Sequence, residues 1–158
     1  LRLLLVGDDP FGDGRERAEA EAQRLGLLGS NGPGAAVFTG IRRDVPALMA
    51  ASDVFCMASR WEGLGLVFLE AMAASTPVLS TNVSAIPEVV VDGETGRLVP
   101  PDDPDSMAEG MLELARDEVL RARLGAAGHR RVLTRFGLDR MVDETIEVYG
   151  EVISARKR

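Results

Sequence analysis

The sequence predicts an α/β protein with a doubly wound parallel sheet followed by C-terminal helices. Short apolar runs alternate with longer amphipathic segments over residues 3–99, which is the pattern of strands joined by helical crossovers. From Pro104 onward the pattern is helical with few breaks. Loops rich in glycine, serine and charged residues follow the apolar runs. In a sheet of this class such loops meet at the carboxyl ends of the strands, where ligands bind.

The segment before Pro104 supplies the predicted strands, which cover Leu3–Val6, Ala35–Thr39, Asp53–Met57, Pro77–Ser80 and Arg97–Val99. Asp13–Leu28 is predicted as a surface helix because its alanines and leucines recur at helical spacing. Ser30–Gly34 is predicted as a loop, and Asp44 as the cap of the next helix. The loops expected at the ligand-binding edge are Gly7–Asp13, Gly40–Asp44, Ala58–Gly65 and Ser80–Pro87.

The last part of the chain is predicted to form helices over Asp105–Ala115, Glu118–Gly125, Ala126–Arg135 and Asp139–Ile153. Asp139 is a suitable N-cap for the last of these. That helix carries an apolar stripe formed by Val142, Ile146, Tyr149 and Ile153. We predict one domain over residues 1–155, with residues 156–158 as a frayed tail.

Composition excludes several classes of function. The formal net charge of −7 argues against a nucleic-acid partner. A single cysteine, Cys56, leaves no internal disulfide, and one histidine leaves little for a transition-metal site. No apolar run approaches the roughly 20 residues that span a bilayer, so we expect no transmembrane segment and a cytoplasmic location. The chain begins inside a strand pattern without methionine, as expected for a piece of a longer protein.

The stretch Arg60–Pro77 is expected to organise the molecule. Nearly every side chain from Leu66 to Ala74 is apolar, so a helix here should be buried on most sides. Glu70 lies within that helix, and a buried carboxylate is costly unless it is hydrogen-bonded.

The start of this helix carries the predicted chemistry. Glu62 is followed by Gly63 and Gly65, and glycines there let a diphosphate approach the backbone. The unpaired N–H groups of a helix N-terminus favour phosphate. Because carboxylates repel a diphosphate, the two glutamates should face neutral hydroxyls, such as those of the sugar rings of a nucleotide sugar.

The stretch Glu62–Leu79 resembles the signature of retaining GT-B glycosyltransferases of the GT4 type, the glycosyl transferases group 1, with Glu62 and Glu70 as its paired glutamates. The resemblance extends along the chain in the family's usual order. The further matching segments are Val37–Gly40, Ala50–Val54, Ile86–Val90, Asp92–Val99 and Pro101–Pro104.

This resemblance implies the Rossmann-like, C-terminal half of a GT-B fold, which binds a UDP- or GDP-linked hexose and transfers it to an unidentified acceptor. It implies that Glu62 contacts the donor sugar during catalysis and that Glu70 holds the ribose hydroxyls. The other donor-binding residues that it implies are Gly40, Ile41, Gly63, Leu64, Gly65 and Leu66. Transfer with retained anomeric configuration is expected to need no metal and no cofactor besides the donor.

The sequence departs from the family pattern in two places. Ser75 stands where glycine is usual, and Ser84-Ala85 where a glycine pair is frequent. The family's basic pair for the diphosphate would lie before Leu1, and the acceptor pocket in an N-terminal domain. We therefore expect this chain to bind donor weakly and to be inactive alone; the full-length protein would be cytoplasmic or peripheral at a membrane.

Alternatives remain open for the individual residues and for the function. Glu70 is also suited to a structural pair with an arginine, and Glu62 to a solvated loop position. Trp61 is suited to stacking on a sugar or to packing. The alternative functions are a GT-B-fold sugar-nucleotide epimerase and a non-catalytic nucleotide-binding or interaction module.

Overall fold

The computed structural model describes residues 1–9, 12–29 and 34–156. The chain divides into two compact units, Leu1–Val45 and Pro46–Arg158, and each is described by itself. Most of the predicted Ser30–Gly34 loop lies outside the described residues, as do Pro10, Phe11 and the last two residues of the predicted tail. The single domain predicted over residues 1–155 stays a prediction.

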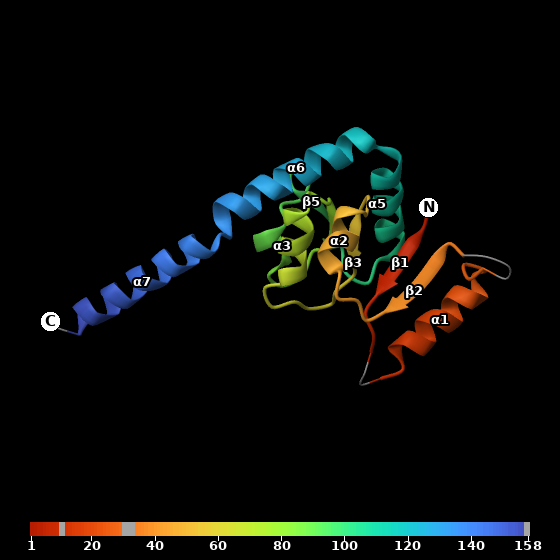
Figure 1. Ribbon diagram of the computed structural model, residues 1–158, viewed down its shortest axis with the longest axis horizontal. Coiled ribbons are helices and arrows are strands. Elements are labelled where there is room, and N and C mark those ends of the chain that lie inside the picture. Colours follow the sequence, from red (N-terminus) through yellow and green to blue (C-terminus); the bar gives the residue numbers. More distant parts are fainter. Residues whose placement is uncertain (10–11, 30–33, 157–158) are drawn as a thin grey trace. The chain divides into compact units, whose positions relative to one another are not determined.

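The described part of the first unit forms two parallel strands joined by a helix. β1 (Leu3–Val6) pairs with β2 (Ala36–Gly40), and α1 (Gly14–Arg24) forms the crossover between them in the sequence (Figure 1). The side chains of β1 are more exposed than a buried strand predicts: Leu3, Leu4 and Val6 are 41–45% exposed. Within the described residues β1 is hydrogen-bonded to β2 alone, which leaves its other edge unpaired.

The helix α1 is shorter than the sequence predicts. It ends at Arg24, because Leu25 caps it and Gly26 adopts a left-handed conformation with φ of +69°. An αL glycine directly after a helix is a common stop signal, so it outweighs the apolar spacing that continues to Leu28.

The second unit is built on a parallel sheet with the order β3-β4-β5. Its strands are β3 (Phe55–Met57), β4 (Val78–Thr81) and β5 (Gly96–Val99), and α2 (Val45–Ala50), α3 (Leu66–Ala73) and α4 (Ile86–Val89) precede them or connect them. β4 is the central strand, and all of its residues are buried. The predicted alternation of parallel strands and helices is therefore confirmed, with the described strands hydrogen-bonded in two sheets.

The core of the second unit lies between this sheet and the helices that follow it. It is formed by Leu79, Val99, Met107, Leu114 and Leu124, with Cys56 packed against it. The Cys56 thiol lies 3.5 Å from the Met107 sulfur. Burial raises the pKa of the Cys56 thiol to about 11, because the low-dielectric surroundings disfavour the thiolate. The position and the raised pKa of this thiol agree with a packing role for Cys56.

The C-terminal part forms the helices α5 (Pro104–Arg116), α6 (Glu118–Arg135) and α7 (Leu138–Ala155). Asp103 and Asp117 cap α5 and α6 by accepting hydrogen bonds from the backbone N–H groups of Ser106 and Leu120. Gly137 is the N-cap of α7, so the prediction of Asp139 as its cap is wrong; Asp139 lies in the first turn, where its charge favours the helix dipole.

The helix α7 is exposed on every side in the described structure, and its predicted apolar stripe is uncovered. No helix within the described residues is long and apolar enough to cross a membrane.

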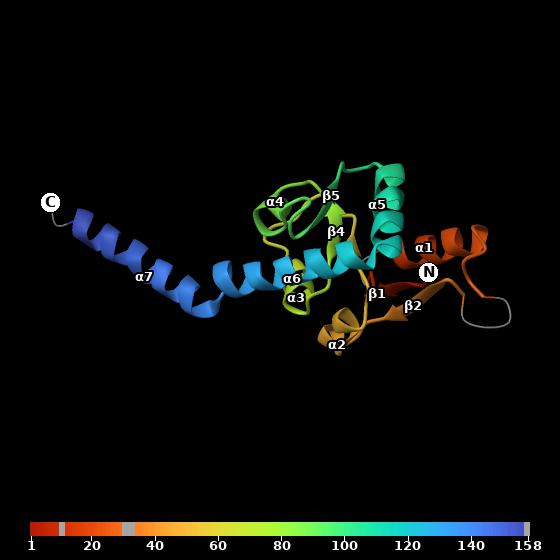
Figure 2. The same ribbon diagram turned by 90° about the horizontal axis from the view of Figure 1, so that it is seen from above.

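The helix α6 is continuous, whereas the sequence predicted a break after Gly125. It runs alongside α3 in both views (Figure 1 and Figure 2). Gly125 and Gly128 are buried at this contact, and a Cβ at Gly125 would lie 2.1 Å from the Ser75 carbonyl oxygen. Close packing thus explains these glycines better than helix termination does, since the tertiary contact outweighs their low helix propensity.

The end of α3 has the hydrogen bonding of a Schellman motif. The Ser75 N–H donates to the Met72 carbonyl and the Thr76 N–H to the Ala71 carbonyl, each at 3.0 Å. Ser75 itself is left-handed, with φ of +60°. Ser84, the other departure from the family's glycine pattern, also has positive φ, at +49°. The backbone therefore keeps the glycine-type conformation at both positions although the residue is serine.

Candidate functional site

The loop between β3 and α3 carries the first candidate glutamate. Glu62 is half-buried in this loop, and its Oε1 accepts a hydrogen bond of 2.8 Å from the Ser59 hydroxyl. The loop follows the carboxyl end of β3, where ligands bind in sheets of this class. Glu62 therefore has a fixed partner rather than the free, solvated carboxylate of the alternative interpretation.

The strand β4 holds the start of this loop through its two last side chains. The Thr81 hydroxyl donates to the Ser59 carbonyl at 2.5 Å, and the Ser80 hydroxyl donates to the Met57 carbonyl at 2.7 Å. Both hydroxyl residues are buried, at 4% and 0% exposure. The backbone pairing of β3 with β4 ends at Met57 and Ser80, so these bonds extend the connection into the loop.

The start of α3 is open toward solvent. Gly65 is its N-cap, with φ of +67° and no side-chain capping bond. A Cβ at Gly63 would meet only open space, whereas a Cβ at Gly65 would lie 2.5 Å from the Phe68 ring. The first N–H groups of this helix are thus unprotected by side chains, which is the arrangement that attracts anions.

The Glu62 carboxylate lies beside this helix start. Its Oε2 is 3.8 Å from the position that a Gly65 Cβ would occupy. Phe68, the third residue of α3, is fully buried and stacks edge-to-face on Phe55 of β3, with ring centroids 5.9 Å apart. This contact fixes α3, and with it the helix start, on the sheet.

The second candidate glutamate lies on an exposed face of α3, so the prediction of a helix buried on most sides is wrong. Phe68, Ala71 and Met72 are buried, whereas Leu66, Glu70 and Ala73 are exposed. The exposed residues are spaced at i, i+4 and i+7, which places them on one face. Within the described residues the Glu70 carboxylate makes no hydrogen bond or ion pair, which disfavours the alternative of a structural arginine partner.

The remaining candidates, Gly40 and Ile41, belong to the first unit. Gly40 ends β2 with φ of +65°, and Ile41 is 75% exposed directly after it. A Cβ at Gly40 would lie 3.4 Å from a guanidinium nitrogen of Arg15 in α1. The Arg15 guanidinium bonds Glu19 at 2.8 Å and lies 3.8 Å from Asp8, and this pairing raises the pKa of Arg15.

The structure thus gathers part of the predicted site. It brings Glu62, Gly63, Leu64, Gly65 and Leu66 together at the start of α3, with Glu70 one turn further along. The role of Gly40 and Ile41 in donor binding stays a prediction. Sequence reasoning missed Ser59 and Thr81. The spacing Ser59-x-x-Glu62 matches the letters of a capping box, but the two side chains bond each other in a non-helical loop, so the sequence held no specific signal for this contact.

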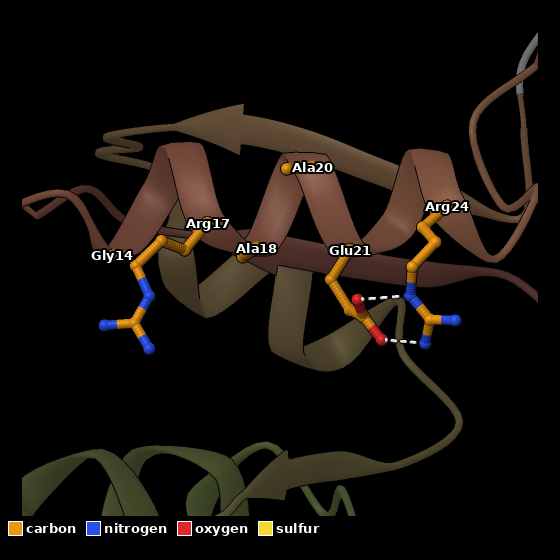
Figure 3. A pocket seen from close by; sticks show the side chains of 6 residues that line it. All are labelled: Gly14, Arg17, Ala18, Ala20, Glu21 and Arg24. Atoms are coloured by element: carbon orange, nitrogen blue, oxygen red, sulfur yellow. Dashed lines mark hydrogen bonds and ion pairs between the residues drawn. The ribbon is translucent and has the colours of Figure 1, made fainter.

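A hollow elsewhere on the surface has no features of a ligand site. It lies along α1 and is lined by Gly14, Arg17, Ala18, Ala20, Glu21 and Arg24 (Figure 3). Its charged groups are already paired: Arg24 forms a two-pronged pair with Glu21 at 2.8 and 2.5 Å, and Arg17 lies 3.8 Å from Asp13. No group of histidine, cysteine and carboxylate side chains in the described part of the chain is arranged to hold a metal ion.

Comparison with known proteins identifies the family. The family described as glycosyl transferases group 1 matches residues 1–117. The chain belongs to this family. The glycosyl transferases group 1 relatives include N-acetyl-alpha-D-glucosaminyl L-malate synthase of Bacillus anthracis, which is 34% identical over 117 residues, covering 74% of this chain and 31% of that protein.

Two solved structures place this group 1 chain within the GT-B architecture. The HepE protein of Anabaena in complex with UDP-glucose matches with a TM-score of 0.84 and 28% identity, over 95% of this chain and 41% of that one. The C-terminal domain of a group 1 protein from Francisella tularensis matches with a TM-score of 0.70 and 31% identity, over 80% of this chain and 64% of that one. The chain is a glycosyltransferase domain that corresponds to the C-terminal portion of its relatives.

Proposed function

We propose that this chain is the donor-binding domain of a retaining glycosyltransferase whose donor is a UDP- or GDP-linked hexose. The observation that carries the proposal is the open start of α3, where an uncapped helix N-terminus, a left-handed glycine and the Glu62 carboxylate lie together. Membership of the glycosyl transferases group 1 supports it. The HepE complex with UDP-glucose supports the donor class, with UDP favoured as the nucleotide.

The diphosphate has a natural position at the start of α3. Its charge is complementary to the N-terminal end of the helix dipole, and the backbone of Gly63 and Gly65 can reach its oxygens without hindrance from side chains. Stabilising the leaving diphosphate in this way accelerates transfer, because negative charge builds on it as the glycosidic bond breaks.

The two glutamates have complementary tasks in this proposal. Glu70 is exposed on α3 and has no partner among the described residues, so its carboxylate is free to accept hydrogen bonds from both ribose hydroxyls. Glu62 is oriented by Ser59 and contacts hydroxyls of the hexose being transferred. Gly40 and Ile41 are proposed to lie near the base. The acceptor and the completion of the diphosphate site belong to the remainder of the full-length protein.

Isothermal titration and ligand-observed NMR with the 158-residue chain test this assignment. We expect binding of UDP and UDP-glucose in the millimolar range or tighter. Glu70→Gln should weaken both ligands by about tenfold, the effect of losing one strong charge-assisted hydrogen bond. Glu62→Gln should weaken UDP-glucose but not UDP, because a neutral side chain beside the helix start repels the diphosphate less than a carboxylate does.

The control is Glu147→Gln, which makes the same change on the exposed helix α7 and should alter neither affinity. Parallel titrations with GDP and GDP-mannose decide the base. Failure of all these ligands to bind at millimolar concentration, with the chain folded, would contradict the proposed function.

A further inference from the structure

We propose that Ser59 is a positioning residue for Glu62 and that Thr81 anchors Ser59, so that these hydroxyls set the discrimination between the nucleotide sugar and the bare nucleotide. The inference rests on the proposed role of Glu62 toward the transferred hexose. It goes beyond that role because it assigns the orientation of the carboxylate to residues outside the paired glutamates.

The two carboxylate oxygens of Glu62 have different surroundings. Oε1 accepts the Ser59 hydroxyl at 2.8 Å, which leaves Oε2 on the side of Gly65, 3.8 Å from the position of its missing Cβ. A carboxylate on a flexible glutamate side chain has several rotamers. A hydrogen bond to one oxygen selects the rotamer that directs the other toward the start of α3.

Ser59 is itself held in place by the sheet. A serine on a mobile loop would move together with Glu62 and orient nothing. The Ser59 carbonyl, however, accepts the hydroxyl of Thr81 at 2.5 Å, and Thr81 is 4% exposed in the central strand β4. The connection therefore runs from a buried strand through one backbone carbonyl to the Glu62 carboxylate.

The orientation of Glu62 should affect the affinity for a UDP-hexose more than the affinity for UDP. If the hexose hydroxyls bind Oε2, the orientation of Glu62 contributes to the affinity only of ligands that carry the hexose. The diphosphate at the backbone and the ribose at Glu70 do not use this connection. Loss of the Ser59 hydroxyl should then lower the affinity for a UDP-hexose and spare UDP, because no contact to UDP changes.

The experiment compares the affinities of UDP-glucose and UDP for each variant by isothermal titration. Ser59→Ala should reduce the ratio of the two affinities by about fivefold to tenfold, the size expected for the net effect of one ordinary hydrogen bond. Ser59→Thr keeps a hydroxyl and should restore the ratio. Thr81→Val should reduce it as well, whereas Thr81→Ser should not.

Ser52→Ala is the matched control. It removes a serine hydroxyl that donates to the Leu48 carbonyl at 2.7 Å at the end of α2, before β3 begins, and the ratio should stay at the wild-type value. An unchanged ratio in Ser59→Ala would overturn the inference, as would an equal loss of both affinities, which indicates general damage to the loop.

Failure of the inference and failure of the proposed function have different signatures. Absence of UDP and UDP-glucose binding in the wild-type chain contradicts the proposed function. Amide hydrogen exchange of the loop then still tests the inference. Ser59→Ala and Thr81→Val should speed exchange over residues 58–65, and unchanged exchange in both would overturn the anchoring itself.

Discussion

Replacing Gly125 by alanine tests whether the contact of α6 with the end of α3 determines stability. The added Cβ would lie 2.1 Å from the Ser75 carbonyl oxygen and 3.0 Å from the Ser75 carbonyl carbon. Since real Cβ contacts under 3.0 Å are essentially absent, α6 would have to move by about 0.9 Å. The obstacle is backbone, which cannot rotate away as the end of a side chain can.

Two effects of opposite sign decide the result. Alanine is favoured over glycine inside a helix by about 1 kcal/mol. Overpacking a well-filled contact costs about 1–3 kcal/mol and occasionally more, and a backbone obstacle belongs at the upper end of that range. We therefore expect Gly125→Ala to lower the free energy of unfolding by about 2 kcal/mol, or the melting temperature by about 4–8 °C.

Urea unfolding followed by circular dichroism measures this change. Gly150→Ala is the matched control, because Gly150 is also helical, lies in the exposed helix α7, and has open space where the Cβ would be. This control should raise the helix signal slightly and leave the unfolding midpoint of the core unchanged. A midpoint of Gly125→Ala at or above the wild-type value would refute the reasoning.

Two further predictions follow from the backbone and the core. Ser75→Gly should stabilise the protein by about 0.5–1 kcal/mol, because the left-handed conformation at φ of +60° strains serine and suits glycine; thermal unfolding checks this, and a lower melting temperature would contradict it. The pKa of the Cys56 thiol is raised to about 11, so the unfolded thiol ionises first as the pH rises. The stability contributed by the neutral thiol should therefore be intact below about pH 9 and fall by about 1.4 kcal/mol per pH unit between about pH 9 and 11. Cys56→Ala should remove this part of the pH dependence in urea titrations, and an identical alkaline slope in both proteins would count against it.

Sequence patterns were sufficient where local chemistry determines the structure. The alternation of apolar runs and helical segments predicted both ends of each strand from β1 to β5 to within about two residues. The glycines before α3 predicted the start of that helix, because the left-handed conformation of its N-cap at Gly65 strongly favours glycine. The paired glutamates were found because their spacing belongs to a family signature.

The failures arise where contacts distant in the sequence decide. The apolar composition of α3 predicted burial on most sides, whereas Leu66 is 63% exposed and Glu70 lies on the same open face. The sequence predicts a helix end at Gly125, because no local signal distinguishes a glycine that stops a helix from one that lets a neighbouring carbonyl come close. Thr81 is 22 residues from the carbonyl that it holds, so its role had no signature in the pattern.

The strand β4 combines two tasks within a single short segment. Val78 and Leu79 are fully buried, with Leu79 part of the core cluster, while Ser80 and Thr81 hold the loop that carries Glu62. Substitutions in this strand would therefore affect both the packing of the core and the position of the loop that carries Glu62. Trp61 and Leu64, at 75% and 50% exposure, lie in the same loop and take no part in the hydrogen bonds of Ser80 and Thr81. Substitutions at Trp61 or Leu64 would therefore leave in place the hydrogen bonds that hold the loop to β4.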